Sequence, residues 1–282
     1  MSLQRHEVRI NKFEARADKI YGQLKGKDAR KAKEIITKAQ GIPRPRGPQL
    51  FNPVSVFCSF LCTGDIDSER IKAFRKIIVS YKEHLSKVDL SETDLSGLDL
   101  SNAKLTGAKL NKAKLTNTDL SGAILSDAML IKADLRDAKL VNAVLSRAIL
   151  KEARISRANL SGAVLLNADL FNADLRGVSL HSADLSGINL FYADLIGADL
   201  SGARLADVRL SGADFRKVNF ANADLSSAIL TGARLSGADL SNTKLKDADL
   251  RHAILNKATG LTQDQLEHVI KDKNTKLPKG LK

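Results

Sequence analysis

The chain has 282 residues, a formal net charge of +13, 43% hydrophobic residues and only 4% aromatic residues. This length allows one or two domains, and no stretch of about 18 apolar residues indicates a membrane span. Two cysteines give no disulfide framework, and the first sixteen residues lack the apolar core of a secretory signal, so we expect a cytoplasmic protein.

The positive charge is concentrated before residue 86. The net charge is +9 for residues 1–85, +2 for 86–260 and +2 for 261–282. These ranges also differ in pattern, which predicts a basic, mostly helical N-terminal extension, a central repeat region and a C-terminal cap. The cations that form a basic arm in the extension are Arg5, Arg9, Lys12, Arg16, Arg30, Lys31, Lys33, Arg44 and Arg46.

The extension begins with two predicted helices, one over 3–24, where apolar residues recur at helical spacing, and a second over 29–39, which is crowded with Arg and Lys. Residues 41–48 read Gly-Ile-Pro-Arg-Pro-Arg-Gly-Pro and cannot be helical, because proline lacks an N–H group and restricts the preceding residue. We expect an extended Pro/Arg tether there.

The next segment, 50–62, is apolar and alternates as a strand would, so we expect it to pack on the end of the repeat region. A metal or lipidation site at Cys58 and Cys62 is the alternative, but metal binding needs three or four ligands and no His lies nearby. Residues 68–85 follow as an amphipathic helix. We expect this helix to cap the repeat region, since an uncovered solenoid end exposes apolar side chains and unpaired backbone groups.

The repeat region has a period of five residues. From Leu90 to Leu255 every fifth residue is Leu, except Ile155, Phe215 and Phe220, which gives 34 units, and the residue two places earlier is Ala in 25 of them. Neither a helix of 3.6 residues per turn nor a strand of period two keeps such residues on one face. A tight turn in each unit would point Leu and Ala inward and leave three polar positions in water.

Tandem units of Ala-(Asp or Asn)-Leu-X-X, such as residues 183–187 and 238–242, resemble the pentapeptide-repeat family over residues 88–257. The resemblance implies an all-β solenoid, a right-handed quadrilateral parallel β-helix with four units per coil. About 8.5 coils at the usual spacing of neighbouring strands would form a rod about 40 Å long.

The pattern stops at Gly260, and a C-terminal cap is predicted over 261–282. Thr262 and Gln265 form a capping-box pattern, which predicts a short helix through Ile270, and residues 275–278 are expected to be extended. The tail resembles the closing segment of bacterial pentapeptide arrays, which favours a bacterial source, with cyanobacteria as one candidate.

We expect no enzyme and no catalytic, cofactor-binding or metal-binding residues. The five His residues are scattered, and the many Asp residues recur with the repeat rather than as acid–base pairs. No phosphate-binding loop or nucleophile elbow is present in the sequence, and a core filled with Leu would leave no cleft.

Folding the outward positions onto four faces predicts one apolar stripe, here called the apolar surface. Its members are Ile124, Met129, Ile131, Val144, Ile149, Val164, Leu166, Phe171, Phe191 and Tyr192. A contiguous apolar patch usually marks a contact surface, and aromatic residues are typical anchors. Either the N-terminal extension covers this surface, or a partner protein or a second copy in a homodimer does.

The adjacent face is rich in arginine but interleaved with Asp, which predicts a solvated, self-neutralising ladder rather than a nucleic-acid groove. Its cations are Lys114, Arg136, Arg154, Arg157, Arg176, Arg216, Lys217 and Arg234. We call it the arginine face.

These features favour a non-catalytic adaptor or linker that docks on a protein assembly with acidic surfaces through the apolar surface and the basic arm. A photosynthetic antenna-type complex is one such host. The alternative is a regulator of nucleic-acid transactions, either through topoisomerase interaction, which implies an acidic rod unlike this one, or through nonspecific binding by the arm. Peripheral attachment of the arm to an anionic membrane is a third hypothesis.

Overall fold

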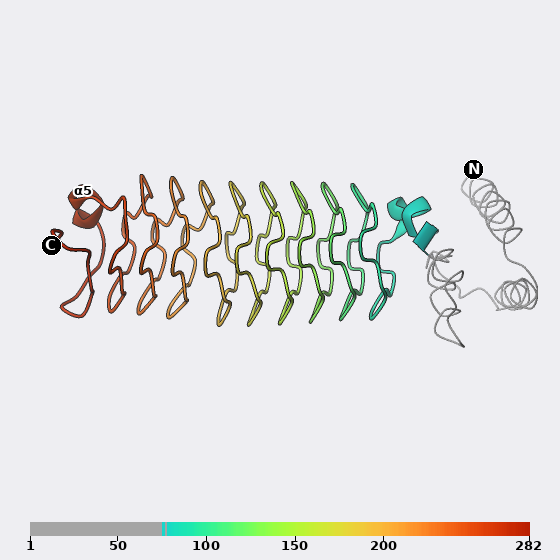
Figure 1. Ribbon diagram of the computed structural model, residues 1–282, viewed down its shortest axis with the longest axis horizontal. Coiled ribbons are helices and arrows are strands. Elements are labelled where there is room, and N and C mark those ends of the chain that lie inside the picture. The colour runs from blue at the N-terminus through green and yellow to red at the C-terminus, as the bar shows by residue number, and fades with distance from the viewer. Residues whose placement is uncertain (1–74, 77) are drawn as a thin grey trace, which may run out of the picture. The chain divides into compact units, whose positions relative to one another are not determined.

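The computed structural model describes residues 75, 76 and 78–282 (Figure 1). The chain divides into two compact units, Met1–Ser80 and Tyr81–Lys282. In the first unit residues 75, 76 and 78–80 are helical, and Ile78 is fully buried. The basic arm, the helices predicted at 3–24 and 29–39, the tether at 41–48 and the segment 50–62 with its two cysteines lie outside the described residues.

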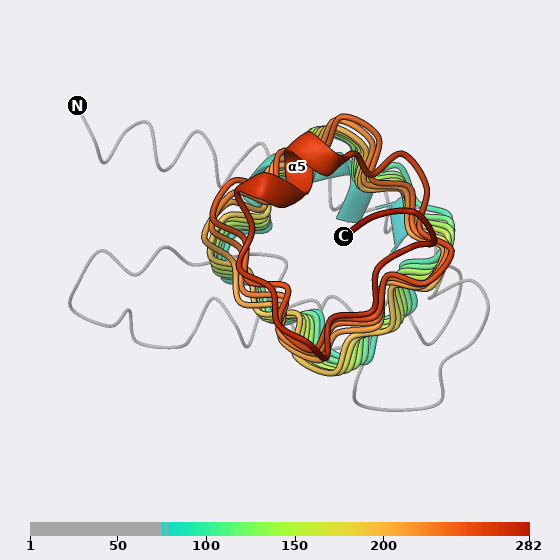
Figure 2. The same ribbon diagram turned by 90° about the vertical axis from the view of Figure 1, so that its left-hand side faces the viewer.

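The second unit is a stack of coils. Residues twenty positions apart form parallel bridges, from Asp89↔Lys109 to Asp239↔Thr259. Because the unit is five residues long, four units complete each coil, and the view along the stack superimposes the coils as one ring (Figure 2). The predicted parallel solenoid with four units per coil is confirmed, with each strand reduced to a single bridging residue per unit.

Each unit buries two side chains and turns the backbone. Ala128 and Leu130 are fully buried, and the N–H of Ala133 donates to the carbonyl of Leu130 at 3.0 Å. The residue two places after each central Leu has a positive φ, such as 58° at Lys132. A positive φ at the third of four residues is the mark of a type II turn, which explains why Gly and Asn recur at this position.

The interior is filled by the Leu and Ala columns, and every central residue from 85 to 255 is buried. Phe215 and Phe220 replace Leu and lie edge to face, with ring centroids 5.3 Å apart. Thr118 replaces Ala and donates its hydroxyl to the carbonyl of Leu95 at 2.9 Å, while Thr243 donates to Phe220 at 2.8 Å. The departures from the pattern therefore leave no buried hydroxyl without an acceptor at these two sites.

The N-terminal end of the solenoid differs from the prediction. The helix expected to reach Leu85 is helical in its described residues only to Ser80, and Lys82–His84 form the 3₁₀ helix η1. Leu85 is instead the first central residue of the solenoid. It is fully buried, and its carbonyl accepts the turn hydrogen bond from the N–H of Val88 at 3.3 Å. Packing in the solenoid core therefore overrides the helical periodicity of this segment.

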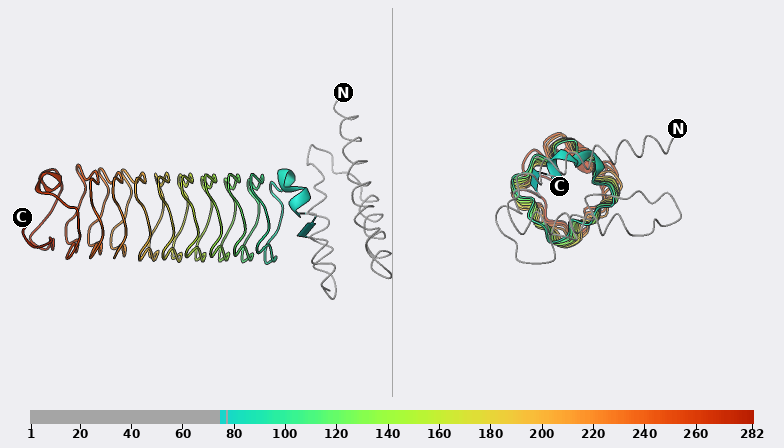
Figure 3. Two further views of the ribbon diagram at one scale, coloured as in Figure 1. Left: turned by 45° about the horizontal axis from the view of Figure 1, so that its top comes forward. Right: turned by 90° about the vertical axis from the view of Figure 1, so that its right-hand side faces the viewer.

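The C-terminal end is closed by helix α5 (Gln263–Glu267), at the opposite end of the coil stack from η1 (Figure 3). The capping box is confirmed, since the Gln265 side chain accepts from the N–H of Thr262 at 2.7 Å and the Thr262 hydroxyl accepts from the N–H of Gln265 at 3.3 Å. The predicted extension of this helix to Ile270 is wrong. Ile270 forms a parallel bridge with Asp249, which satisfies the backbone edge of the last coil.

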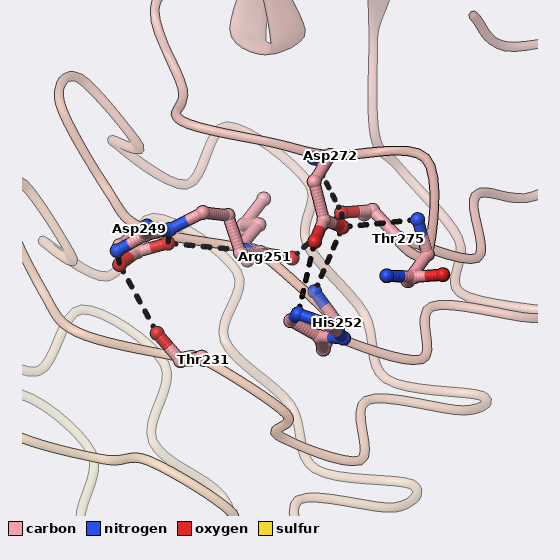
Figure 4. Close-up of polar contacts among 8 residues, drawn as sticks. Thr231, Asp249, Arg251, His252, Asp272 and Thr275 are labelled. Atoms are coloured by element: carbon pink, nitrogen blue, oxygen red, sulfur yellow. Dashed lines mark hydrogen bonds and ion pairs between the residues drawn. The ribbon is translucent and has the colours of Figure 1, made fainter.

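The chain after α5 is pinned to the last coil by polar contacts (Figure 4). The backbone N–H of His252 donates to one carboxylate oxygen of Asp272 at 3.1 Å, and the His252 ring lies 3.1 Å from the other. Thr275 donates its hydroxyl to the carbonyl of Leu250 at 3.0 Å. Lys276 then bridges Ile254, which confirms the extended tail. Among the described residues no helix is long and apolar enough to cross a membrane.

Candidate protein-binding surface

Apolar side chains replace polar ones at outward positions on two neighbouring faces of the solenoid. On the first face, parallel bridges stack Ile124 on Val144 and Val144 on Val164. On the second face, Met129 stacks on Ile149. Ile124 is exposed and the other four are half-buried, so both columns present methyl groups to solvent.

An aromatic cluster, consisting of Phe171, Phe191 and Tyr192, lies farther along the second face. The rings of Phe171 and Phe191 are stacked with centroids 6.2 Å apart, and Tyr192 meets Phe171 edge-on at 5.8 Å. Phe191 is 50% exposed and Tyr192 is 70% exposed. These two rings are the most exposed large hydrophobic side chains on the described coils, apart from Ile270 in the C-terminal cap.

The ten predicted residues do not form one uninterrupted stripe. The guanidinium of Arg147 makes two hydrogen bonds to Asp127, at 2.7 and 2.8 Å, at the corner between the two columns. Lys151 occupies the coil between Ile131 and Phe171 and pairs with Asp169 at 3.1 Å. These ion pairs lie between the apolar side chains. The apolar surface is therefore divided into the two columns and the aromatic cluster. Leu166 is 40% exposed and extends the first face.

One signal at Tyr192 was missed by the sequence analysis. Its φ is 62°, in the left-handed region that costs a bulky residue conformational energy. Every unit places this turn position in the same region, and elsewhere along the described coils the residue is Gly, polar or charged. Comparison of the repeat units within the sequence would have shown that a tyrosine here is unusual, because the turn suits Gly or Asn.

The arginine face is self-neutralising, as predicted. Arg136 forms a bidentate pair with Asp134 at 2.7 and 2.6 Å, and Arg154 lies 3.4 Å from the same carboxylate. Burial alone would raise the pKa of Asp134, but the hydrogen bonds from Arg136 outweigh it and hold that pKa below its ordinary value. Arg216 holds the pKa of Asp214 below its ordinary value in the same way. Charges already paired within the protein make a poor phosphate-binding groove.

Among residues 75, 76 and 78–282 no group of three or more His, Cys, Asp or Glu side chains is placed to hold a metal ion. The sequence-predicted arm residues lie outside this range, so the apolar surface is the candidate site that the structure describes.

Several comparisons with known proteins bear on this fold. The family model described as Pentapeptide repeats matches in eight copies, over overlapping segments that run from residue 84 to residue 256. No curated protein matches the chain.

Among solved structures, HetL, a pentapeptide repeat protein involved in heterocyst differentiation regulation from the cyanobacterium Nostoc, is 33% identical; the match covers 73% of this chain and 93% of HetL, with a TM-score of 0.41. QnrB1, a plasmid-mediated fluoroquinolone resistance protein, is 23% identical over 59% of this chain and 85% of its own, with a TM-score of 0.39. A pentapeptide repeat protein from the thylakoid lumen of Arabidopsis thaliana is 27% identical over 42% of this chain and 67% of its own, with a TM-score of 0.18. The family match over more than half of the sequence, together with the twenty-residue bridge register, shows that this chain belongs to the pentapeptide-repeat family, whose members form right-handed quadrilateral β-helices.

Proposed function

We propose that this protein is a non-catalytic adaptor that binds a protein partner through the apolar surface, with the aromatic cluster as its anchor. The observation that carries the proposal is the exposure of Phe191 and Tyr192 side by side, with ring centroids 4.3 Å apart. Exposed rings that are already held against one another lose little freedom on binding, and aromatic anchors contribute a large share of the binding energy at protein interfaces.

The backbone of Tyr192 supports the same interpretation. Elsewhere the repeat uses Gly or a polar or charged residue at this turn position, and a tyrosine there costs conformational energy without filling the core. A residue that works against the local fold while exposing a large ring is typical of a binding site.

The basic arm would supply the second contact. The nine cations of the basic arm suit a partner with an acidic surface, and such charges chiefly set orientation and the rate of association. A multi-subunit assembly of the photosynthetic antenna type is one host with this chemistry. The paired charges of the arginine face disfavour nucleic-acid binding by the solenoid itself, so that alternative function would fall to the basic arm.

The test compares co-purification by the tagged full chain with that by two matched variants. The double variant Phe191→Ser with Tyr192→Asn installs the Ser-Asn pair that the repeat already uses at residues 101–102 and 241–242. The control, His181→Ser with Ser182→Asn, installs the same pair in the same coil on the opposite face. Both variants should keep the solenoid intact, because the new residues already occupy these turn positions elsewhere.

We expect a defined protein complex to co-purify with the wild-type chain and the control, and to be lost or reduced at least about tenfold with the double variant. Deletion of residues 1–48 should make the remaining association slower and insensitive to salt. Equal recovery of the same complex by the double variant would show that the aromatic cluster does not contribute to binding. Equal recovery after deletion of residues 1–48 would show the same for the basic arm.

A further inference from the structure

The hydrogen bonds between successive coils are interrupted at one place. Elsewhere along the stack from Leu90 to Leu240, each central residue donates its N–H to a carbonyl of the next coil, as Leu170 does to Asn189 at 2.8 Å and Leu210 does to Ile229 at 2.7 Å. Between segments 187–195 and 206–214, six bonds of this ladder do not reach normal hydrogen-bond geometry, although the parallel bridge Asp194↔Asp214 is retained. The donors without their expected carbonyls, all within the described coils, are the N–H groups of Gly187, Leu190, Tyr192, Leu195, Arg209 and Asp214.

The two coils also stand farther apart here than other neighbouring coils do (Figure 1). The parallel bridge that the register predicts between Asn189 and Arg209 is absent from the described ladder, although its equivalents Asp169↔Asn189 and Asp184↔Arg204 are present. The interruption is confined to one side of the solenoid, because Leu200 still donates to Asn219 at 2.8 Å. We call segments 187–195 and 206–214 the joint.

The side chains of the Ala column supply a physical cause. Ile188 and Val208 occupy this column in successive coils, twenty residues apart, where the pattern has Ala in both. Isolated substitutions do not open the ladder. Val178 and Val218 each have Ala198 as the neighbour one coil away, and their carbonyls still accept from Asp199 and Asp239, both at 2.9 Å.

Ile188 and Val208 together exceed the space that two Ala residues leave, and overpacking is relieved by backbone shifts. Stacking alone does not open the ladder, because Leu98 and Thr118 are also stacked and Asp119 still donates to the carbonyl of Leu98 at 2.9 Å. The core of the second coil is enlarged further by Phe215 and Phe220. Solvent reaches the column beside the joint, where Ala213 is 8% exposed, whereas Ala233 one coil later is fully buried.

We infer that the joint is a built-in weak point at which the rod opens locally, dividing the solenoid into two cooperative blocks. In a repeat protein each coil is stabilised by its neighbours, so a coil interface that lacks six hydrogen bonds is the place where the stack separates first. Phe191 and Tyr192 belong to the first segment of the joint, and Ser211 and Gly212 occupy their columns in the next coil, so the joint borders the aromatic cluster. The inference goes beyond the proposed function and holds whether or not that cluster binds a partner.

The test is native-state amide hydrogen exchange on the full chain. Amides of 187–195 and 206–214 should exchange at least about tenfold faster than the equivalent amides of 167–175 and 226–234, one coil away on either side. The variant Ile188→Ala with Val208→Ala restores Ala at both stacked positions, and the control Val178→Ala with Val218→Ala removes two branched residues from the equivalent positions on the opposite face, away from the joint.

The Ile188→Ala with Val208→Ala variant should slow exchange at the joint to the level of its neighbours, and the control should leave the fast exchange in place. Uniform exchange along the wild-type coils would overturn the inference. Fast exchange that persists after the Ala column is restored would overturn the assigned cause. The exchange profile of the wild-type chain alone decides whether the joint opens locally, so this part of the test does not depend on the folding of any variant.

Discussion

Replacement of Asp249 by Asn should destabilise the C-terminal coils in a way that depends on pH. The Asp249 carboxylate is buried, with 8% exposure, and accepts hydrogen bonds from the Arg251 guanidinium at 2.9 and 2.7 Å and from the Thr231 hydroxyl at 3.0 Å (Figure 4). These contacts, with Arg251 first, outweigh the opposing effect of burial and lower the pKa of Asp249 from 3.8 to about 2.

A lowered pKa in the folded state means that the ionised carboxylate stabilises the fold. The displacement corresponds to about 2 kcal/mol, which is fully present above the unfolded pKa near 4 and is lost as the pH falls toward the folded pKa near 2. Asn resembles the protonated carboxyl group. The variant should therefore be less stable than wild type by about 2 kcal/mol at pH 7, and the difference should shrink steadily between pH 4 and pH 2.

The assay is urea denaturation followed by circular dichroism across this pH range, with Asp247→Asn as the control. Asp247 is an exposed residue of the neighbouring unit whose side chain makes no hydrogen bond or ion pair within the described coils, so its replacement should change stability little at any pH. A stability difference for Asp249→Asn that stays constant from pH 7 to pH 2 would refute the reasoning, because the loss would then not come from the ionised carboxylate.

Three further changes probe the repeat itself. Gly260→Ala should lower the free energy of unfolding by about 1–3 kcal/mol, because φ is 71° and the new Cβ would lie 2.5 Å from the backbone nitrogen of Ser241. The control Gly97→Ala, with φ of 66° and open space around it, should lower stability less. Equal losses of stability in thermal melts would contradict the steric argument. Thr118→Val should cost about 1 kcal/mol, since it removes the hydroxyl that donates to Leu95 while keeping the volume, and an unchanged urea midpoint would show that this bond contributes nothing. Phe191→Ser with Tyr192→Asn should stay within about 1 kcal/mol of wild type, because relief of the left-handed tyrosine offsets the lost ring contacts; a large drop would mean that the cluster is structural.

Much of the solenoid was predictable because its signal is repeated. The spacing of Leu and Ala fixes which side chains are buried, and the Thr262–Gln265 capping box locates the start of α5. The ends were predicted less well, since Leu85 and Ile270 have helical neighbours in sequence, but Leu85 is buried as the first central residue of the solenoid and Ile270 bridges Asp249 in the last coil. Tertiary pairing overrides local periodicity at both positions.

The candidate site was predicted in part. Outward apolar positions follow from the register, so the columns headed by Ile124 and Met129 were found from sequence. The division of the surface was not, because it depends on which charged side chains reach one another across coils, as Arg147 and Asp127 do. The joint was missed for a related reason, since Ile188 and Val208 are each ordinary replacements for Ala, and their effect depends on stacking against each other in a coil already enlarged by Phe215 and Phe220.

The central claim is that one side of this rod binds a protein partner through Phe191 and Tyr192. Its most direct test is quantitative co-purification by the wild-type chain, the Phe191→Ser with Tyr192→Asn variant and the control on the opposite face, at equal folded concentration. The account predicts that the same complex is recovered by the wild type and the control and is lost from the aromatic variant. Recovery of that complex in equal amount by all three chains would contradict it.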